Sequence, residues 1–354
     1  MISLNEYFNF VHPDLDPAIA GPASLEAMAT LAPWLPASSV RKLGYECRLN
    51  DPVPRLDLSL ALGREGASGL LRSLPRRIAG HPVWAGIRRF AEAWAEPSAL
   101  GNAVQSVWLE FDLVQPWGSE ALPGFIFALD ESVALPRMAP VQLQPLVAAG
   151  LRAVLGGEPP APLMACLANC LRELPGQARL AYVGLMLSRK DPVYRMCLLN
   201  LPAGQTLPYL ERIGWGGDRA RLAEVLAWFE RRTDRTLLDL DVGAGGDLLP
   251  SAAIEGLRPA PGPEGSPLPW AHWLDDLCAG SLCLPAKRDG LRGFTGCSRV
   301  RDDRLWPADP LGIPGRRPRL AMIRAINHIK LGLKPEGPVE AKAYLGVRPL
   351  RYLA

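Results

Sequence analysis

The sequence predicts an α/β fold in which five helix-hairpin-helix repeats build a ten-stranded antiparallel barrel with its helices outside. Three observations support this prediction. Pairs of short segments with alternating polar and apolar residues recur five times along the 354 residues. Segments with helical spacing separate successive pairs. Similar short sequences also recur at equivalent points of different pairs, which is typical of an internal repeat.

Composition and charge exclude several classes of partner. The hydrophobic fraction of 48% and the charged fraction of 21% are typical of a globular protein with a large core. The net charge of +3 is small and spread along the chain, so we expect neither a nucleic-acid partner nor a membrane partner. The first residues lack a basic segment followed by an apolar one, and the seven cysteines are odd in number and scattered. We therefore expect a cytoplasmic protein with reduced thiols.

The last hairpin, predicted at 327–333 and 339–347, shows the pattern most clearly. In its first arm His328 and Lys330 alternate with apolar residues, and in its second arm Lys342 and Tyr344 do the same. One face of the ribbon is therefore apolar and the other is polar. Since a two-stranded ribbon is not stable alone in water, helices must cover the apolar face while the polar face lines solvent or a cavity.

The four earlier hairpins alternate in the same way. In the first, the leucines at 56, 58, 60 and 62 share one face, and Arg55, Asp57 and Ser59 share the other. The predicted arms are 45–49 with 55–62, 107–113 with 124–129, 182–187 with 194–201, and 237–242 with 249–257.

Helical spacing fills most of the stretches between the hairpins. Ser24 is placed to cap a first helix, and Trp84, Ile87 and Phe90 form one apolar stripe of a later one. The predicted helices are 24–35, 69–78, 83–94, 143–155, 162–174, 206–213, 219–232 and 270–278. We treat 1–354 as a single barrel domain with an N-terminal extension at 1–23 and a proline-rich loop at 258–269, and we predict no regular element over 284–318.

Two internal correspondences support a repeat. The segment 51–56 (Asp-Pro-Val-Pro-Arg-Leu) resembles 191–196 (Asp-Pro-Val-Tyr-Arg-Met), and 108–113 resembles 237–242. Ten antiparallel strands avoid exposed sheet edges most simply by closing into a barrel. A barrel of this size has a lumen wide enough for a ligand.

Short motifs on these strands resemble the aromatic prenyltransferase barrel, the ABBA or dimethylallyl-tryptophan-synthase-like fold. The segment 54–59 (Pro-Arg-Leu-Asp-Leu-Ser) is similar to the first hairpin of that family, 111–113 (Phe-Asp-Leu) to the second, and 342–344 (Lys-Ala-Tyr) to its diphosphate-binding strand. The resemblance implies five helix-hairpin-helix units around a ten-stranded lumen. It covers nearly the whole chain as architecture.

The resemblance also implies a function. An isoprenoid would pass from an allylic diphosphate to an aromatic, indole-like small molecule or peptide, and Asp57 would be the catalytic acid that orients the acceptor. Cations would hold the diphosphate, and aromatic side chains would shield the carbocation. The substrate-binding residues implied are Arg48, Arg195, Lys330, Lys342, Tyr344, Trp108, Glu110, Phe125 and Phe127. No cofactor is required in that family, and a role for Mg²⁺ stays open.

An alternative function follows from the same strands. The second and third hairpins lack the Lys-x-Tyr pattern of the family, and only Arg195 remains there. Carboxylates at 110, 112, 239 and 241 lie on the face that carries the cations, and carboxylates repel diphosphate. The alternative is a catalytically inactive or repurposed barrel that binds a natural-product intermediate or a partner protein in a biosynthetic pathway.

Several residues also have a second interpretation. Asp57 could pair with Arg48 across the first hairpin instead of contacting a substrate. The two acid pairs could serve a metal or acid-base chemistry, although ion pairs with arginine are favoured. The segment 237–246 resembles a nucleotide-fold methyltransferase motif without the elements that should follow it. His272, Cys278, Cys283 and Cys297 lack the spacing of a zinc site.

Overall fold

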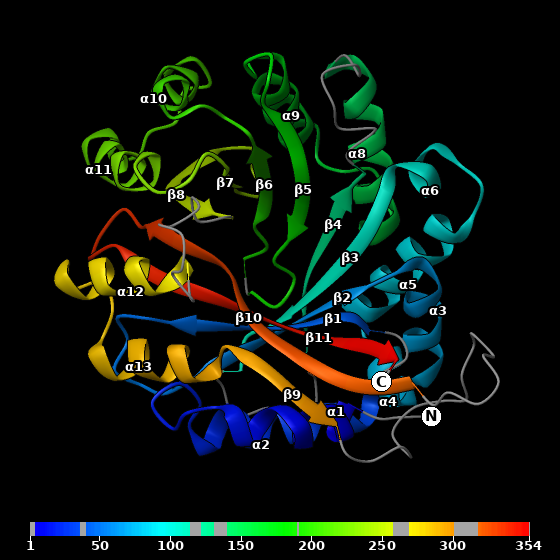
Figure 1. Ribbon diagram of the computed structural model, residues 1–354. Helices are drawn as coiled ribbons and strands as arrows, with labels where there is room; N and C mark the ends of the chain where they lie inside the picture. Colours follow the sequence, from blue (N-terminus) through cyan, green and yellow to red (C-terminus); the bar gives the residue numbers. More distant parts are fainter. Residues whose placement is uncertain are drawn as a thin grey trace.

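The computed structural model describes residues 4–35, 40–113, 122–130, 140–189, 191–257, 269–300 and 318–353. One antiparallel sheet of eleven strands runs through these residues in the order β11-β1-β2-β3-β4-β5-β6-β7-β8-β10-β9. An additional pairing of β10 with β11 closes every strand except β9 into a ring of ten (Figure 1). The predicted ten-stranded antiparallel barrel is confirmed.

Consecutive strands form five hairpins at the predicted places. The strands are β1 (Val40–Arg48), β2 (Leu56–Leu62), β3 (Val104–Phe111), β4 (Gly124–Leu129), β5 (Arg179–Leu185), β6 (Tyr194–Leu199), β7 (Thr236–Val242), β8 (Leu248–Gly256), β9 (Gly296–Val300), β10 (Pro318–Leu333) and β11 (Glu340–Leu353). The prediction of no regular element over 284–318 is wrong, because a helix at Pro285–Phe294 and strand β9 lie there. Strand β9 pairs with the first part of β10, whereas the last part of β10 pairs with β8.

The helices form a layer around the outside of the barrel (Figure 1). They are α1 (Leu4–Val11), α2 (Pro22–Leu31), α3 (Arg64–Ser73), α4 (Arg76–Ala79), α5 (Pro82–Ala95), α6 (Ala99–Ala103), α8 (Pro140–Leu155), α9 (Ala161–Arg172), α10 (Ala203–Arg212), α11 (Arg219–Glu230), α12 (Pro269–Ala279) and α13 (Pro285–Phe294). Each of the eight predicted helices has a counterpart here.

Three helices were not predicted, namely α1, α6 and α13. Helix α1 lies in the segment predicted as an N-terminal extension, yet its Leu4 and Phe8 are fully buried. Each of the three is ten residues or shorter, so the periodic signal is weak. The N-terminal segment is therefore part of the packed outer layer.

The hydrophobic core lies between the sheet and the helices. Every second strand residue, such as Leu58 and Leu60 of β2, is buried there. Phe125 and Phe127 of β4 also point outward, and their rings lie 4.9 and 5.3 Å from the ring of Phe90 in α5. The prediction that these two phenylalanines line the lumen is wrong, because strand alternation turns Ile126 inward instead.

Parts of three predicted segments lie outside the described residues. They are 114–121 between the arms of the second hairpin, 258–268 of the proline-rich loop, and 301–317 of the stretch 284–318. None of the helices that are described has both the length and the apolar character needed to cross a bilayer.

Candidate functional site

The barrel encloses a lumen made of two adjoining cavities, of about 400 and about 790 Å³. The larger one lies at the end where the hairpins turn, and its wall includes Ser188, Lys334 and Pro335 from the turns. We call this the turn end. The smaller one lies at the opposite end and is lined by Trp108, Ile126, Tyr182, Leu237 and Leu257; we call it the aromatic end. Side chains common to both walls join the two cavities, namely Glu110, Arg195, Asp239, Lys330 and Tyr344.

Three cations stand side by side on the lumen wall. In the strand register, Lys330 of β10 lies opposite Lys342 of β11, and Lys342 lies opposite Arg48 of β1. The next row of the same strands carries His328, Tyr344 and Glu46. Alternation in the last hairpin thus brings the predicted residues of 327–347 to the lumen.

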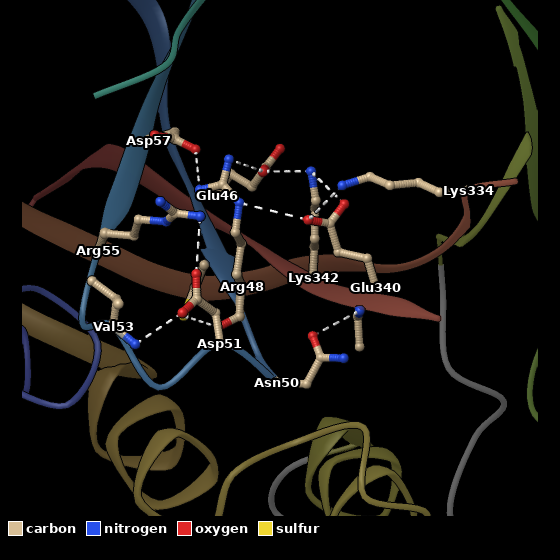
Figure 2. Close-up of polar contacts among 12 residues, drawn as sticks. Glu46, Arg48, Asn50, Asp51, Val53, Arg55, Asp57, Lys334, Glu340 and Lys342 are labelled. Atoms are coloured by element: carbon tan, nitrogen blue, oxygen red, sulfur yellow. Dashed lines mark hydrogen bonds and ion pairs between the residues drawn. The ribbon is translucent and has the colours of Figure 1, made fainter. Parts of the chain in front are cut away.

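Each cation near the turn end has a carboxylate partner. Arg48 Nη1 lies 2.6 Å from Asp57 Oδ2, and Lys342 Nζ lies 2.8 Å from Glu46 Oε1 (Figure 2). The Tyr344 hydroxyl donates a hydrogen bond of 2.6 Å to Glu46 Oε2. Burial alone would raise the pKa of Glu46, but Lys342 and Arg48 together lower it well below its usual value.

Asp57 is held in place by the protein itself. The backbone N–H of Leu113 donates to Asp57 Oδ1 at 2.8 Å, while Oδ2 faces Arg48. Burial and the nearby Glu46 raise the pKa of Asp57 despite its pairing with Arg48. Asp57 lies on the wall of neither cavity, so the geometry favours the ion-pair interpretation over the acceptor-binding one.

The middle of the lumen holds two more ion pairs. Lys330, which is 7% exposed, contacts Asp239 and lies 3.2 Å from Glu255 Oε1. Burial opposes the charge on Lys330, but Asp239 and Glu255 raise its pKa overall. Arg195 binds Asp241 through two hydrogen bonds of 2.8 and 3.0 Å. The predicted arginine pairing of the carboxylates at 239–241 is therefore confirmed for Asp241.

Two glutamates in the lumen lack a cation of their own. Glu255 shares Lys330 with Asp239, and burial together with Asp239 raises the pKa of Glu255 to about 8. The carboxyl group of Glu110 makes no hydrogen bond or ion pair with the residues that the structure describes. Burial raises the pKa of Glu110 as well, and Glu46 and Asp239 add to the shift. Because neither carboxyl has a cation of its own, these two groups of the lumen wall are available to bind a ligand.

His328 lies beside Glu255. Its ring stacks on Tyr344 with 4.2 Å between centroids, and its Nε2 lies 3.4 Å from Glu255 Oε2. Burial, with the charge of Lys330, lowers the pKa of His328 to about 3. The imidazole is therefore neutral at physiological pH and does not add a positive charge to the lumen.

The structure brings most of the predicted site residues together. Arg48, Arg195, Lys330, Lys342, Tyr344, Trp108 and Glu110 all line the lumen. Glu255, Tyr182 and Ile126 also line the lumen and were not predicted. Alternation along 249–257 indicates Glu255, but both faces of 124–129 are apolar, so alternation there does not distinguish Ile126 from Phe125 and Phe127.

Potential metal ligands do not cluster within the described ranges: no group of three or more His, Cys, Asp or Glu side chains could hold an ion there. The lumen carboxylates are instead engaged with cations or face the cavity.

No family model and no curated protein sequence matches this chain. Solved structures do match. 5-Dimethylallyltryptophan synthase from Streptomyces coelicolor is 14% identical over 92% of both chains, with a TM-score of 0.54. The prenyltransferase PriB in its apo form is 13% identical over 94% of both chains, with a TM-score of 0.52. A ternary complex of PriB with L-tryptophan and dimethylallyl thiolodiphosphate matches equally well. At these identities the likeness establishes a shared fold, and it confirms the barrel that the short motifs predicted.

Proposed function

We propose that this chain, whose fold is that of the aromatic prenyltransferase barrel, transfers an isoprenoid from an allylic diphosphate to an aromatic acceptor. The row of cations formed by Lys330, Lys342 and Arg48 carries the proposal. Three adjacent cations suit the oxygens of a diphosphate, because they stabilise the negative charge that develops as it leaves. Solved barrels of the same fold bind tryptophan and analogues of dimethylallyl diphosphate, which supports the proposal.

The two ends of the lumen suit the two substrates. The diphosphate would lie at the turn end against the cation row, with the allyl group directed toward Tyr344 and Trp108. Their rings would shield the carbocation from water. As the carbon–oxygen bond breaks, diphosphate departs with the electron pair and an acceptor ring atom bonds to the allyl carbon. The ring then loses a proton to the departed diphosphate or to water. Glu110, rather than the paired Asp57, would be the carboxyl that contacts the acceptor.

A second function is favoured by the ion pairs themselves. Arg48, Lys342, Lys330 and Arg195 each face a carboxylate in the absence of ligand. A diphosphate must displace those carboxylates, and desolvating both sets of charges opposes its binding. A catalytically inactive barrel that binds a natural-product intermediate would need no such displacement.

Binding and turnover distinguish the two functions. Dimethylallyl diphosphate and inorganic pyrophosphate are added separately to the protein, with Mg²⁺ or with EDTA because the role of Mg²⁺ is open, and Tm is measured. We expect both to raise Tm by several degrees, and we expect mass spectrometry to find prenylated product when tryptophan is added. The variant Lys342→Ala should lose the shift, and the surface variant Arg152→Ala should keep it. If neither compound raises Tm and no product forms, the transferase proposal fails and the second function remains.

A further inference from the structure

The interior of the lumen contains more carboxylates than cations. Four cations line it, Arg48, Arg195, Lys330 and Lys342, together with five carboxyls, Glu46, Glu110, Asp239, Asp241 and Glu255, and a sixth carboxyl, Asp57, lies behind the wall against Arg48. The rim of the turn end is balanced: Arg55 pairs with Asp51, Lys334 lies 3.8 Å from Glu340, and the exposed Arg189 and Asp112 add one charge of each sign. At the rim of the aromatic end, Lys42 and Arg348 are exposed to water. The excess of negative groups therefore lies in the interior.

The carboxyls in excess of the cations can be assigned to particular side chains. Pairing Arg48 with Asp57, Lys342 with Glu46, Arg195 with Asp241 and Lys330 with Asp239 uses every interior cation once. Glu110 and Glu255 remain. Both line the smaller cavity, and burial raises the pKa of each.

An unsatisfied acceptor atom lies at the same place. Asp239 is 4% exposed, and its Oδ1 has no hydrogen-bond partner in the part of the chain that is described. The thiol of Cys197, opposite Asp239 on the neighbouring strand, is only a weak donor, so a stronger donor from a ligand or a water would be favourable there. Asp239 and Glu110 both line the two cavities.

The wall around these carboxyls is aromatic. Trp108, Tyr182, Tyr344 and His328 line the smaller cavity together with Glu110 and Glu255. Aromatic faces attract cations, and carboxylates among them add a direct charge partner. A cavity of about 400 Å³ accommodates a ligand of the size of a bicyclic aromatic amine.

We infer that the ligand of the aromatic end is an aromatic amine, whose protonated nitrogen lies between Glu110 and Glu255 while its ring packs against Trp108 and Tyr182. This deepens the proposed function and rests on it in one respect, because it takes the ligand to be the acceptor. The positive charge of such an acceptor also offsets the lumen carboxylates, which otherwise oppose the diphosphate at the neighbouring turn end.

Proton release identifies this mode of binding. A cation placed between the two carboxyls favours their ionised forms, so a carboxyl that is protonated before binding must lose its proton. Calorimetric titration in two buffers with different ionisation enthalpies measures the protons released. The probes are tryptamine, 3-ethylindole and indole-3-propionate, which carry a cationic, a neutral and an anionic group on the same ring.

We expect tryptamine at pH 7 to bind at least about tenfold more tightly than 3-ethylindole and to release a proton, and we expect indole-3-propionate not to bind. Glu110→Gln should weaken the binding of tryptamine at least about tenfold and leave the affinity for 3-ethylindole unchanged. Glu255→Gln should abolish the proton release. The surface variant Glu158→Gln, at an exposed ion pair with Arg152, should match the unmodified protein.

Equal binding of tryptamine and 3-ethylindole, or tryptamine binding that is unchanged in Glu110→Gln, would overturn the inference. The titrations contain no diphosphate, so they do not depend on transfer. Tryptamine binding without any prenylated product would remove the proposed function and leave the cation site. Prenylation of a neutral acceptor, with no preference for tryptamine, would remove the cation site and leave the proposed function.

Discussion

The two ends of the lumen are built from the same ten strands but differ in how their charges are satisfied. At the turn end, Arg48, Lys342 and Glu46 form a connected set of ion pairs (Figure 2). Toward the aromatic end, Glu110 has no cation of its own and Glu255 shares one. The difference indicates that ion pairs within the protein satisfy the charges of the turn end. At the aromatic end, the carboxyls of Glu110 and Glu255 are available to a ligand.

Lys330 separates the two environments. It belongs to the cation row with Lys342, yet its partners Asp239 and Glu255 line the aromatic end. Any ligand that recruits Glu255 must therefore change the surroundings of Lys330, and through it the cation row. The electrostatics of the two ends are linked by this one side chain.

The largest loss of stability is expected from removing the charge of Lys330. Lys330→Met leaves Asp239 buried without its cation, which should destabilise the protein by about 3–5 kcal/mol. Urea unfolding measures the change. In the double variant Lys330→Met with Asp239→Leu the Asp239 carboxylate is removed together with its cation. Glu255 also loses Lys330, but its raised pKa of about 8 keeps that carboxyl protonated at neutral pH, so most of the stability should return. A double variant as unstable as the single one would show that Lys330 acts through packing rather than charge.

A smaller change in stability is expected when the pH is varied. The pKa of Glu255 is raised in the folded state to about 8, from about 4.5 in the unfolded chain, so the unfolded chain loses this proton first as the pH rises. Stability contributed by Glu255 is thus complete below about pH 4.5 and is lost as the pH rises through about 8, by at most about 1.4 kcal/mol per pH unit.

Glu255→Gln, which resembles the protonated form, should remove this dependence. The comparison is made by urea unfolding at several pH values between 5 and 9. Parallel pH profiles for the two proteins would mean that Glu255 ionises normally, and the contrast between the two ends of the lumen would lose its main support.

A still smaller effect is expected at the turn end. Lys342→Met removes the closest cation of Glu46, but Arg48 Nη2 remains 3.7 Å from Glu46 Oε1 and Tyr344 still donates to Glu46. Because the partner keeps other donors, we expect a loss of only about 1 kcal/mol, again by urea unfolding. A loss as large as that of Lys330→Met would show that the turn end is no better paired than the middle of the lumen.

The sequence predicted the fold well because the outward face of each strand follows a simple rule. Leu56, Leu58 and Leu60 alternate with polar residues, and the helices that cover them carry matching apolar stripes. The misses were short helices and β9, whose pairing partner lies in the distant strand β10. A strand that forms only by pairing with a segment far away in the sequence leaves no local pattern by which it could be predicted.

The site was harder to predict, for a physical reason. Alternation says which side chains point inward, so Arg48, Lys330, Lys342 and Glu110 were placed correctly. It fails where both faces of a strand are apolar, as in β4, and Phe125 and Phe127 were misplaced there. Which carboxylate meets which cation depends on strand register, and register is a property of the closed barrel.

The smallest effect is expected at the rim of the turn end. Lys334 is 65% exposed and lies 3.8 Å from Glu340, so water and salt screen their attraction. Lys334→Met should change the free energy of unfolding by no more than about 0.5 kcal/mol, and 1 M NaCl should erase the difference. Lys342 lies 3.4 Å from the same Glu340, but deeper in the lumen. A salt-resistant loss in Lys334→Met would mean that the paired region extends to the rim, and that the boundary between the two environments lies farther out than Lys342.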